Sequence, residues 1–402
     1  MSYQLLIDGE LVDGERTLSV INPATGKEFA TCARASETQL HDAVAAAKRA
    51  FPAWAKLSHA DRKARIEAFA QGIEDRKQEF AELLTSEQGK PLAQATAEVG
   101  GAIAILRHFA GIELPLETLR ESDEGKVLEQ HSPLGVVAAI TPWNFPLSIL
   151  MLKVGPGLST GNTMVVKPAP TTPLTTALLG EVASTTLPAG VFNVIIDDND
   201  LGSVLSSHPD IAKVSFTGST ATGKRVMESA SGTLKRLTLE LGGNDAAIIL
   251  DDVDPKEIAP RIFGAAMVNA GQVCLAAKRI YAPRSMYDAL CEELATLARN
   301  AVVDDGMKEG TQIGPLQNKQ QYEKVLGYID EASRDGSIIA GGKALDRDGY
   351  FIEPTIVRDI PDDAPLVREE QFGPVVPVLA YDSIDEVVAK ANDSEYGLGG
   401  TI

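Results

Sequence analysis

The sequence predicts an α/β protein with a doubly wound parallel sheet followed by a second α/β unit. From about residue 135 onward, apolar runs rich in β-formers alternate with amphipathic or Ala/Leu-rich segments, and this alternation is typical of a parallel sheet covered by helices on both faces. The length of 402 residues allows two or three domains at about 150 residues each. The strands expected in the first sheet are residues 136–140, 164–167, 191–196, 214–216 and 237–241.

Helix-capping residues and apolar periodicity predict the elements before and after this sheet. Roughly the first 110 residues are predicted to be helical, because Ser36 with Gln39 forms the pattern of a capping box and Ser58 opens a second helix. Residues 116–134 resemble a polar hairpin around Asp123, expected to pack on another subunit or domain. The second α/β unit is expected to contain a helix opened by Asp254, helices near 285–300, 318–334 and 383–392, and strands at 279–282, 337–340, 350–356 and 375–380.

Composition excludes several classes of function. The chain carries 37 basic and 56 acidic side chains, a net charge of −19, and it has no Lys/Arg block that would bind a nucleic acid or an anionic membrane. Three cysteines do not make a disulfide framework, and the N-terminus lacks the features of a signal peptide. Residues 135–158 are long enough for a membrane span, but Pro142, Pro146 and Pro156 interrupt them. We therefore expect a cytoplasmic protein with no nucleic-acid or membrane partner.

A glycine-rich turn follows the expected strand 214–216 and opens a helix. Backbone N–H groups at such a turn bind phosphate. The spacing of Gly218, Gly223 and Lys224 approaches a P-loop, but Arg225 stands where a Mg²⁺-binding Ser or Thr is needed. A nucleoside-triphosphatase, or a purely structural turn, remains an alternative at this point.

Cys274 is the candidate nucleophile. Gly271 allows an unusual backbone path before it and small residues follow it, whereas Cys32 and Cys291 lack such surroundings and are read as structural. Glu240 ends an apolar strand before a Gly-Gly turn, where partial burial is expected to raise its pKa toward that of a general base. Asn144, between two prolines, could donate to an oxyanion. Taken singly, each residue also has a structural interpretation: a buried thiol, a salt bridge and a turn former.

Taken together, the motifs identify the chain as resembling the aldehyde dehydrogenase superfamily from its N-terminus to Ile402. The motifs occur in the order and near the spacing of that family: TPWNFPL (141–147), VVKPA (165–169), LPAGVFNVI (187–195), FTGST (216–220), LELGG (239–243), GQVC (271–274) and EEQFGPVVPV (369–378). The resemblance implies NAD(P)-dependent oxidation of an aldehyde to a carboxylic acid. It also implies a Rossmann-like NAD(P)-binding domain (1–115 and 135–240), an oligomerisation hairpin (116–134) and a catalytic domain (241–402).

The resemblance also implies roles for individual residues. Cys274 would form a thiohemiacetal and then a thioester, Asn144 would hold the oxyanion, Glu240 would activate water, and Lys153 would belong to a proton path. Contacts with NAD or NADP are implied for Trp143, Lys167, Gly190, Gly218, Ser219, Leu241, Glu370 and Phe372. No metal is implied. The expected partners are a small aldehyde and further copies of the chain, in a homodimer or homotetramer.

Two departures from the family leave alternatives open. Pro170 replaces the glutamate with which many NAD-preferring relatives bind the ribose, so the choice between NAD and NADP is open. The chain ends at YGLGGTI, whereas relatives continue for several tens of residues, so we expect it alone to be inactive or nearly so. The alternatives are a CoA-acylating semialdehyde dehydrogenase, which Glu240 disfavours, and a non-catalytic fragment that retains cofactor binding.

Overall fold

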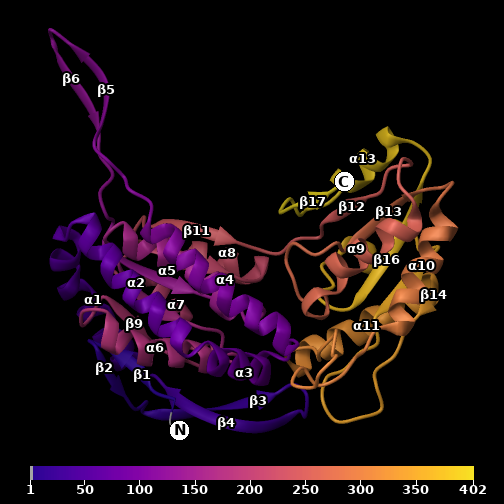
Figure 1. Ribbon diagram of the computed structural model, residues 1–402, viewed down its shortest axis with the longest axis horizontal. Helices are drawn as coiled ribbons and strands as arrows, with labels where there is room; N and C mark the ends of the chain where they lie inside the picture. The colour runs from indigo at the N-terminus through magenta and orange to yellow at the C-terminus, as the bar shows by residue number, and fades with distance from the viewer. Residues whose placement is uncertain (1–2) are drawn as a thin grey trace. The chain divides into compact units, whose positions relative to one another are not determined.

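The computed structural model describes residues 3–402, which form two compact units (Figure 1). Unit 1 contains the described residues up to Val20, Ala30–Leu83 and Thr96–Glu240, and unit 2 contains Ile21–Phe29, Leu84–Ala95 and Leu241–Ile402. The chain therefore crosses from unit 1 to unit 2 between Glu240 and Leu241. Helices α3 (Lys77–Gln88) and α4 (Leu92–Ala110) each contribute residues to both units.

Unit 1 is built on a seven-stranded sheet with the order β11-β10-β7-β8-β9-β1-β2. Five of its strands are parallel: β7 (Val136–Ile140), β8 (Thr163–Lys167), β9 (Phe192–Val194), β10 (Ile211–Thr217) and β11 (Arg236–Glu240). Strands β8 and β9 lie on one side of β7, and β10 and β11 lie on the other. This reversal of strand order at β7 is the doubly wound topology, and the predicted fold class is confirmed.

Two helices of unit 1 begin where the sequence pattern placed them. Ser36 and Gln39 form the expected capping box at the start of α1, and the Ser58 side chain caps α2. Phe69 packs against Phe192 with ring centroids 5.6 Å apart, so that α2 closes over the sheet. The remaining bounds are α1 (Glu37–Lys56), α2 (His59–Asp75), α5 (Pro146–Ser159), α6 (Leu174–Thr186), α7 (Gly202–Ser207) and α8 (Thr220–Ser231).

The expectation that the first 110 residues are helical is wrong for the N-terminal part. Four strands precede α1: β1 (Leu5–Ile7), β2 (Glu10–Val12), β3 (Arg16–Asn22) and β4 (Lys27–Arg34). Strands β1 and β2 extend the large sheet in antiparallel orientation, while β3 and β4 form a two-stranded sheet. Few residues of β3 and β4 are buried, so the apolar alternation by which a strand is recognised is weak in both.

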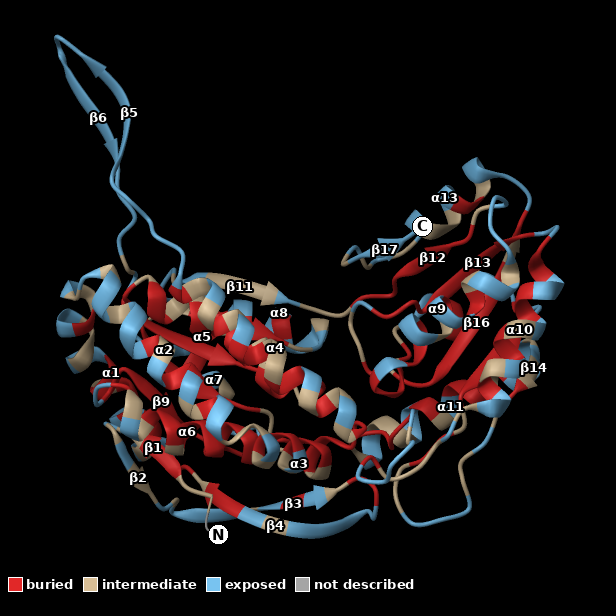
Figure 2. Ribbon diagram, in the orientation of Figure 1, coloured by how far each residue is buried: buried red, intermediate tan, exposed pale blue. Residues whose placement is uncertain are grey.

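The predicted hairpin is present and consists of β5 (Glu117–Ser122) and β6 (Gly125–Glu129) in antiparallel register. All eleven residues of the two strands are exposed, apolar ones included, as Figure 2 shows along the whole length of the hairpin. Leu119 and Leu128 are 60% and 50% exposed. A two-stranded hairpin is marginal in water without something to pack against.

Unit 2 contains a six-stranded sheet of order β14-β15-β16-β13-β12-β17. Its strands are β12 (Ala246–Ile248), β13 (Arg279–Pro283), β14 (Ser337–Ala340), β15 (Thr355–Arg358), β16 (Val375–Tyr381) and β17 (Gly400–Thr401). The helical segments are α9 (Pro255–Met267), η1 (Val268–Gly271), α10 (Tyr287–Asn300), α11 (Lys319–Asp335), α12 (Pro365–Arg368) and α13 (Ile384–Asn392). The core of the unit lies between this sheet and its helices.

One strand of unit 2 is shorter than the sequence predicts. A strand is expected over 350–356, but β15 begins only at Thr355. Pro354 has no N–H to donate to a ladder, and the preceding residues make only an isolated bridge, between Ala344 and Ile352.

No helix among residues 3–402 is long and apolar enough to cross a membrane.

Candidate active site

Several candidate residues lie at one edge of the unit 1 sheet. Strand β7 ends at Ile140, level with Lys167 at the end of β8, and β10 ends at Thr217, level with Glu240 at the end of β11. Because these strands are parallel, their following loops leave the sheet at the same edge, where ligands of doubly wound sheets bind. The candidates that this edge brings together are Trp143, Asn144, Lys167, Gly218, Ser219 and Glu240.

The glycine-rich turn opens a helix, as predicted. The Ser219 side chain caps α8 by accepting a hydrogen bond from the N–H of Thr222 at 3.2 Å. The N–H of Gly218 donates to the carbonyl of Glu240 at 3.0 Å, which ties the turn to β11. The N-terminus of α8 therefore presents backbone N–H groups at the ligand edge of the sheet, an arrangement that suits a phosphate.

Lys153 is buried beneath this edge on α5. Its ammonium donates to the hydroxyl of Thr217 at 2.7 Å and to that of Ser215 at 3.2 Å. Burial lowers the pKa of Lys153 to about 8, while the negative charge of Glu240 opposes that shift. A lysine with this pKa exchanges a proton near neutral pH.

The carboxylate of Glu240 is exposed, so the expectation of partial burial is wrong. Its strand, β11, is the edge strand of the sheet and has one neighbour only, β10. The apolar run around Glu240 indicates a strand correctly, but it does not reveal that this strand lies at the edge.

Lys167 forms a buried ion pair that the sequence did not reveal. Its ammonium lies 2.6 Å from Oδ1 of Asp197, and both side chains are almost completely buried. The other carboxylate oxygen of Asp197 accepts from the N–H of Leu201 at 2.8 Å. Asp197 directly follows the strand expected over 191–196, although β9 itself ends at Val194, so the sequence pattern could have indicated it. Pro170 provides no carboxylate near Lys167. Asp197, which follows the neighbouring strand β9, provides one instead.

Gly190 is not brought to this edge. It precedes β9 by two residues and therefore lies at the amino end of that strand, opposite to Lys167. A Cβ at Gly190, where φ is +76°, would lie 2.7 Å from the carbonyl oxygen of Ala46 in α1. The structure thus gives Gly190 a packing role against α1.

The second group of candidates lies in unit 2, just before three parallel strands. Leu241 leads to β12, Cys274 precedes β13, and Glu370 and Phe372 precede β16. These segments therefore meet at the amino edge of the unit 2 sheet. Figure 1 shows β12, β13 and β16 side by side.

The turn before Cys274 follows the unusual path that Gly271 was expected to allow. Asn269, Ala270 and Gly271 have φ values of +51°, +55° and +72°, all in the left-handed region. A Cβ at Gly271 would lie 2.3 Å from the carbonyl oxygen of Gly373, so the turn packs directly against the loop that carries Phe372. Only a glycine fits at this point.

Replacing Gly271 with Ala is expected to lower the free energy of unfolding by about 2 to 4 kcal/mol, because the new methyl group meets a backbone carbonyl at a left-handed position. Gly264→Ala, inside α9 where a Cβ meets nothing within 4 Å, is the matched control and is expected to stabilise by about 1 kcal/mol at most. Denaturant unfolding measures both changes. Equal stability of the two variants would contradict this account of the turn.

Cys274 is the accessible thiol of the three. It is a free cysteine of intermediate exposure, whereas Cys32 and Cys291 are buried, as expected for structural cysteines. Burial raises the pKa of the Cys274 thiol, and the positive charge of Lys278 opposes this shift. Burial raises the pKa of Cys291 to about 12, which leaves that thiol inert near neutral pH.

The Glu370 carboxylate is held by two groups of unit 2. The N–H of Gly243 donates to its Oε1 at 3.1 Å, and the ammonium of Lys278 lies 3.5 Å from the same oxygen. The loop continues to Phe372, which has a φ of +52°. The Gln321 side chain of α11 donates to the carbonyl of Phe372 at 3.0 Å and so holds the loop in this conformation.

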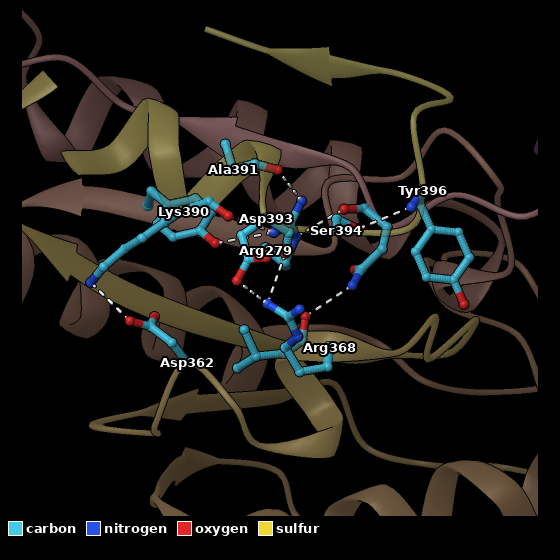
Figure 3. A network of polar contacts seen from close by, with 11 residues as sticks. Arg279, Asp362, Arg368, Lys390, Ala391, Asp393, Ser394 and Tyr396 are labelled. Atoms are coloured by element: carbon cyan, nitrogen blue, oxygen red, sulfur yellow. Dashed lines mark hydrogen bonds and ion pairs between the residues drawn. The ribbon is translucent and has the colours of Figure 1, made fainter. Parts of the chain in front are cut away.

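The segment that carries Cys274 is anchored at its far end by Arg279. This guanidinium donates to the carbonyls of Lys390 at 3.3 Å and Ala391 at 3.0 Å, at the end of α13 (Figure 3). It also donates to the carbonyl of Asn244 at 2.9 Å. Figure 3 also shows Arg368 bound to Asp393, and Lys390 paired with Asp362. Arg279 therefore binds carbonyls in the last turn of α13 and fixes the start of β13, five residues after Cys274.

Known proteins resemble this chain over nearly its whole length. A family model described as "Aldehyde dehydrogenase family" matches residues 11–402. A probable aldehyde dehydrogenase of Pseudomonas is 41% identical over 98% of this chain and 81% of its own length. The NADP(+)-linked succinate-semialdehyde dehydrogenase of Escherichia coli is 37% identical over 98% of this chain and 84% of its own. The structure of a Bacillus cereus aldehyde dehydrogenase in complex with NAD+ matches with a TM-score of 0.97 and 37% identity, over 100% of this chain and 84% of that one.

Proposed function

The chain belongs to the aldehyde dehydrogenase family and is an oxidoreductase that acts on aldehydes with NAD or NADP, and on this premise we propose that Cys274 is its nucleophile. The observation that carries the proposal is the accessibility of this thiol, since the thiols of the other two cysteines are buried. Asn144 and Glu240, from the ligand edge of unit 1, complete the proposed catalytic set.

In the proposed reaction the Cys274 thiolate attacks the aldehyde carbon, and a C–S bond forms as the carbonyl π bond opens. The resulting oxyanion accepts hydrogen bonds from the Asn144 amide and from the backbone N–H of Cys274. A bound NAD or NADP supplies the acceptor for the hydride that leaves this carbon. The product on Cys274 is a thioester.

Glu240 then acts as the general base of hydrolysis. Its exposed carboxylate takes a proton from a water molecule, the water oxygen attacks the thioester carbon, and the C–S bond breaks to release the carboxylic acid. The negative charge of Glu240 acts on Lys153, whose pKa is about 8. We assign it the transfer of that proton away from Glu240, through the hydroxyl of Thr217 to which it is bonded.

The residues at the two edges suit a dinucleotide. The N-terminus of α8 behind Gly218 and Ser219, with Trp143 on the loop after β7, fits a pyrophosphate, and Lys167 beside Asp197 fits a ribose. In unit 2 we assign Glu370 to the nicotinamide ribose, and Phe372 and Leu241 to the nicotinamide itself. Gly190 is left out because it lies at the opposite edge.

We also propose that unit 1 is the NAD(P)-binding domain, that unit 2 is the catalytic domain, and that the hairpin β5–β6 joins copies of the chain in a dimer or tetramer. The exposed Leu119 and Leu128 support an oligomeric role for the hairpin. The buried, free thiol of Cys291 supports a reducing, cytoplasmic location.

The activity is tested with a panel of aldehydes supplied with NAD or NADP, by following the absorbance of the reduced cofactor. In a form of the chain extended to the length of its relatives, we expect reduction of at least one cofactor without any added thiol acceptor. A reaction that requires coenzyme A would replace hydrolysis by acyl transfer and would contradict the role of Glu240. Absence of reduction with every pair, together with a Cys274 that resists alkylating agents, would contradict the proposal as a whole.

A further inference from the structure

Lys278 is a buried cation between the candidate nucleophile and a candidate cofactor ligand. Its side chain is 3% exposed. The ammonium donates to the carbonyl oxygen of Cys274 at 2.6 Å and lies 3.5 Å from Oε1 of Glu370. One N–H of the ammonium thus bonds the Cys274 carbonyl, and the Glu370 carboxylate forms an ion pair with the same ammonium. Lys278 thus connects the loop of Cys274 to the loop of Glu370, within unit 2.

The surroundings of Lys278 act on its charge in two directions. Burial has the larger effect and lowers the pKa of Lys278, while the negative charges of Glu370 and Asp245, and that of Cys274 when ionised, oppose this shift. The face of the Phe372 ring also lies 6.0 Å from the ammonium, at the outer limit of a cation–π contact. A buried charge without partners is costly, and here the partners are groups of the candidate site.

Lys278 and Glu370 act on the Cys274 thiol in opposite directions. The positive charge of Lys278 lowers the pKa of this thiol, and the negative charge of Glu370 raises it. Because Lys278 and Glu370 are themselves in contact, part of the lysine charge is neutralised by the carboxylate. The thiolate and the carboxylate therefore compete for one cation.

We propose that Lys278 is a positioning residue that stabilises the Cys274 thiolate and holds its loop, and that Glu370 sets how much of the lysine charge the thiolate receives. This inference rests on the proposed function of Cys274 as the nucleophile. The contact between Lys278 and the Cys274 carbonyl also orients the backbone from which the thiol projects.

The test is the rate at which iodoacetamide alkylates Cys274, measured against pH, with peptide mass spectrometry to locate the label. In Lys278→Met we expect the rate near neutral pH to fall about three- to tenfold and the whole pH profile to move to higher pH, because the thiolate loses its cation. In Glu370→Gln we expect the profile to move to lower pH. Lys278→Arg keeps the charge and is expected to lie between the wild type and Lys278→Met.

Lys319→Met is the matched control, since it removes the same charge from an exposed site on α11 and is expected to leave the profile in place. An unchanged profile in Lys278→Met, or shifts of Lys278→Met and Glu370→Gln in the same direction, would overturn the inference. If Lys278→Met does not fold, the directions in which the pH profiles of Glu370→Gln and Lys278→Arg move decide whether the inference holds. Turnover that persists in Cys274→Ala would refute the proposed nucleophile, whereas the alkylation profiles test Lys278 without turnover.

Discussion

Replacement of Cys274 by Ala is expected to abolish aldehyde oxidation, with kcat/KM lowered by at least about 10³-fold, because no C–S bond can form and no thioester can follow. The measurement is the rate of cofactor reduction with the best aldehyde of the panel. Cofactor binding, followed by the quenching of protein fluorescence, is expected to persist, since most of the proposed cofactor contacts lie at the ligand edge of unit 1.

The matched control is Cys291→Ala. This thiol is buried in α10, and its loss is expected to reduce stability by about 1 kcal/mol while turnover continues. Iodoacetamide is expected to inactivate the wild type and Cys291→Ala alike. Full turnover in Cys274→Ala would exclude Cys274 as the nucleophile. The accessibility of this thiol would then have no catalytic meaning.

The Glu240→Gln variant is expected to form the thioester and then stall. The amide cannot take a proton from water, so hydrolysis slows by about 10² to 10⁴-fold while the earlier steps continue. Rapid mixing is expected to show a burst of about one reduced cofactor per active site. Mass spectrometry of the intact protein is expected to show the added acyl group on Cys274.

The control for this variant is Glu228→Gln, which removes an exposed carboxylate from α8 in the same unit. It is expected to leave both the burst and the steady rate as they are in the wild type. A Glu240→Gln enzyme that turns over at the wild-type rate, with no accumulated acyl group, would show that another group activates the water. The exposure of Glu240 makes this control important, because Glu228 is also an exposed carboxylate of the same unit.

Much of the fold follows from local patterns. The five parallel strands of unit 1 appear as apolar β-rich runs because both faces of a doubly wound sheet are buried, and the caps at Ser36 and Ser58 mark helix starts because their hydroxyls satisfy backbone N–H groups. The strands β1 to β4 were missed for the converse reason. Few residues of β2, β3 and β4 are buried, so the apolar pattern of a strand is weak there. Strand β1 is buried but only three residues long.

The candidate site was predictable to the extent that its chemistry is local. Cys274 stands out because Gly271 and small residues surround it, and the left-handed turn at Gly271 confirms the backbone path that was expected. Glu240 was placed correctly at the end of a strand but was wrongly expected to be partly buried. Whether a strand lies at the centre or the edge of a sheet depends on which strands pair with it, and those lie far away in sequence.

The sequence by itself determined the α/β class, the identity of the candidate nucleophile, base and oxyanion donor, and the likeness to aldehyde dehydrogenases. The tertiary structure alone decided that Lys278 is buried between Cys274 and Glu370 and that Asp197 pairs with Lys167. It also placed Gly190 at the edge opposite to the other cofactor candidates. A lysine or aspartate has the same letter whether it is solvated or buried, and its partners come from loops as far as 92 residues away (278 to 370). Burial and charge pairing are properties of those long-range contacts, so only the folded chain specifies them.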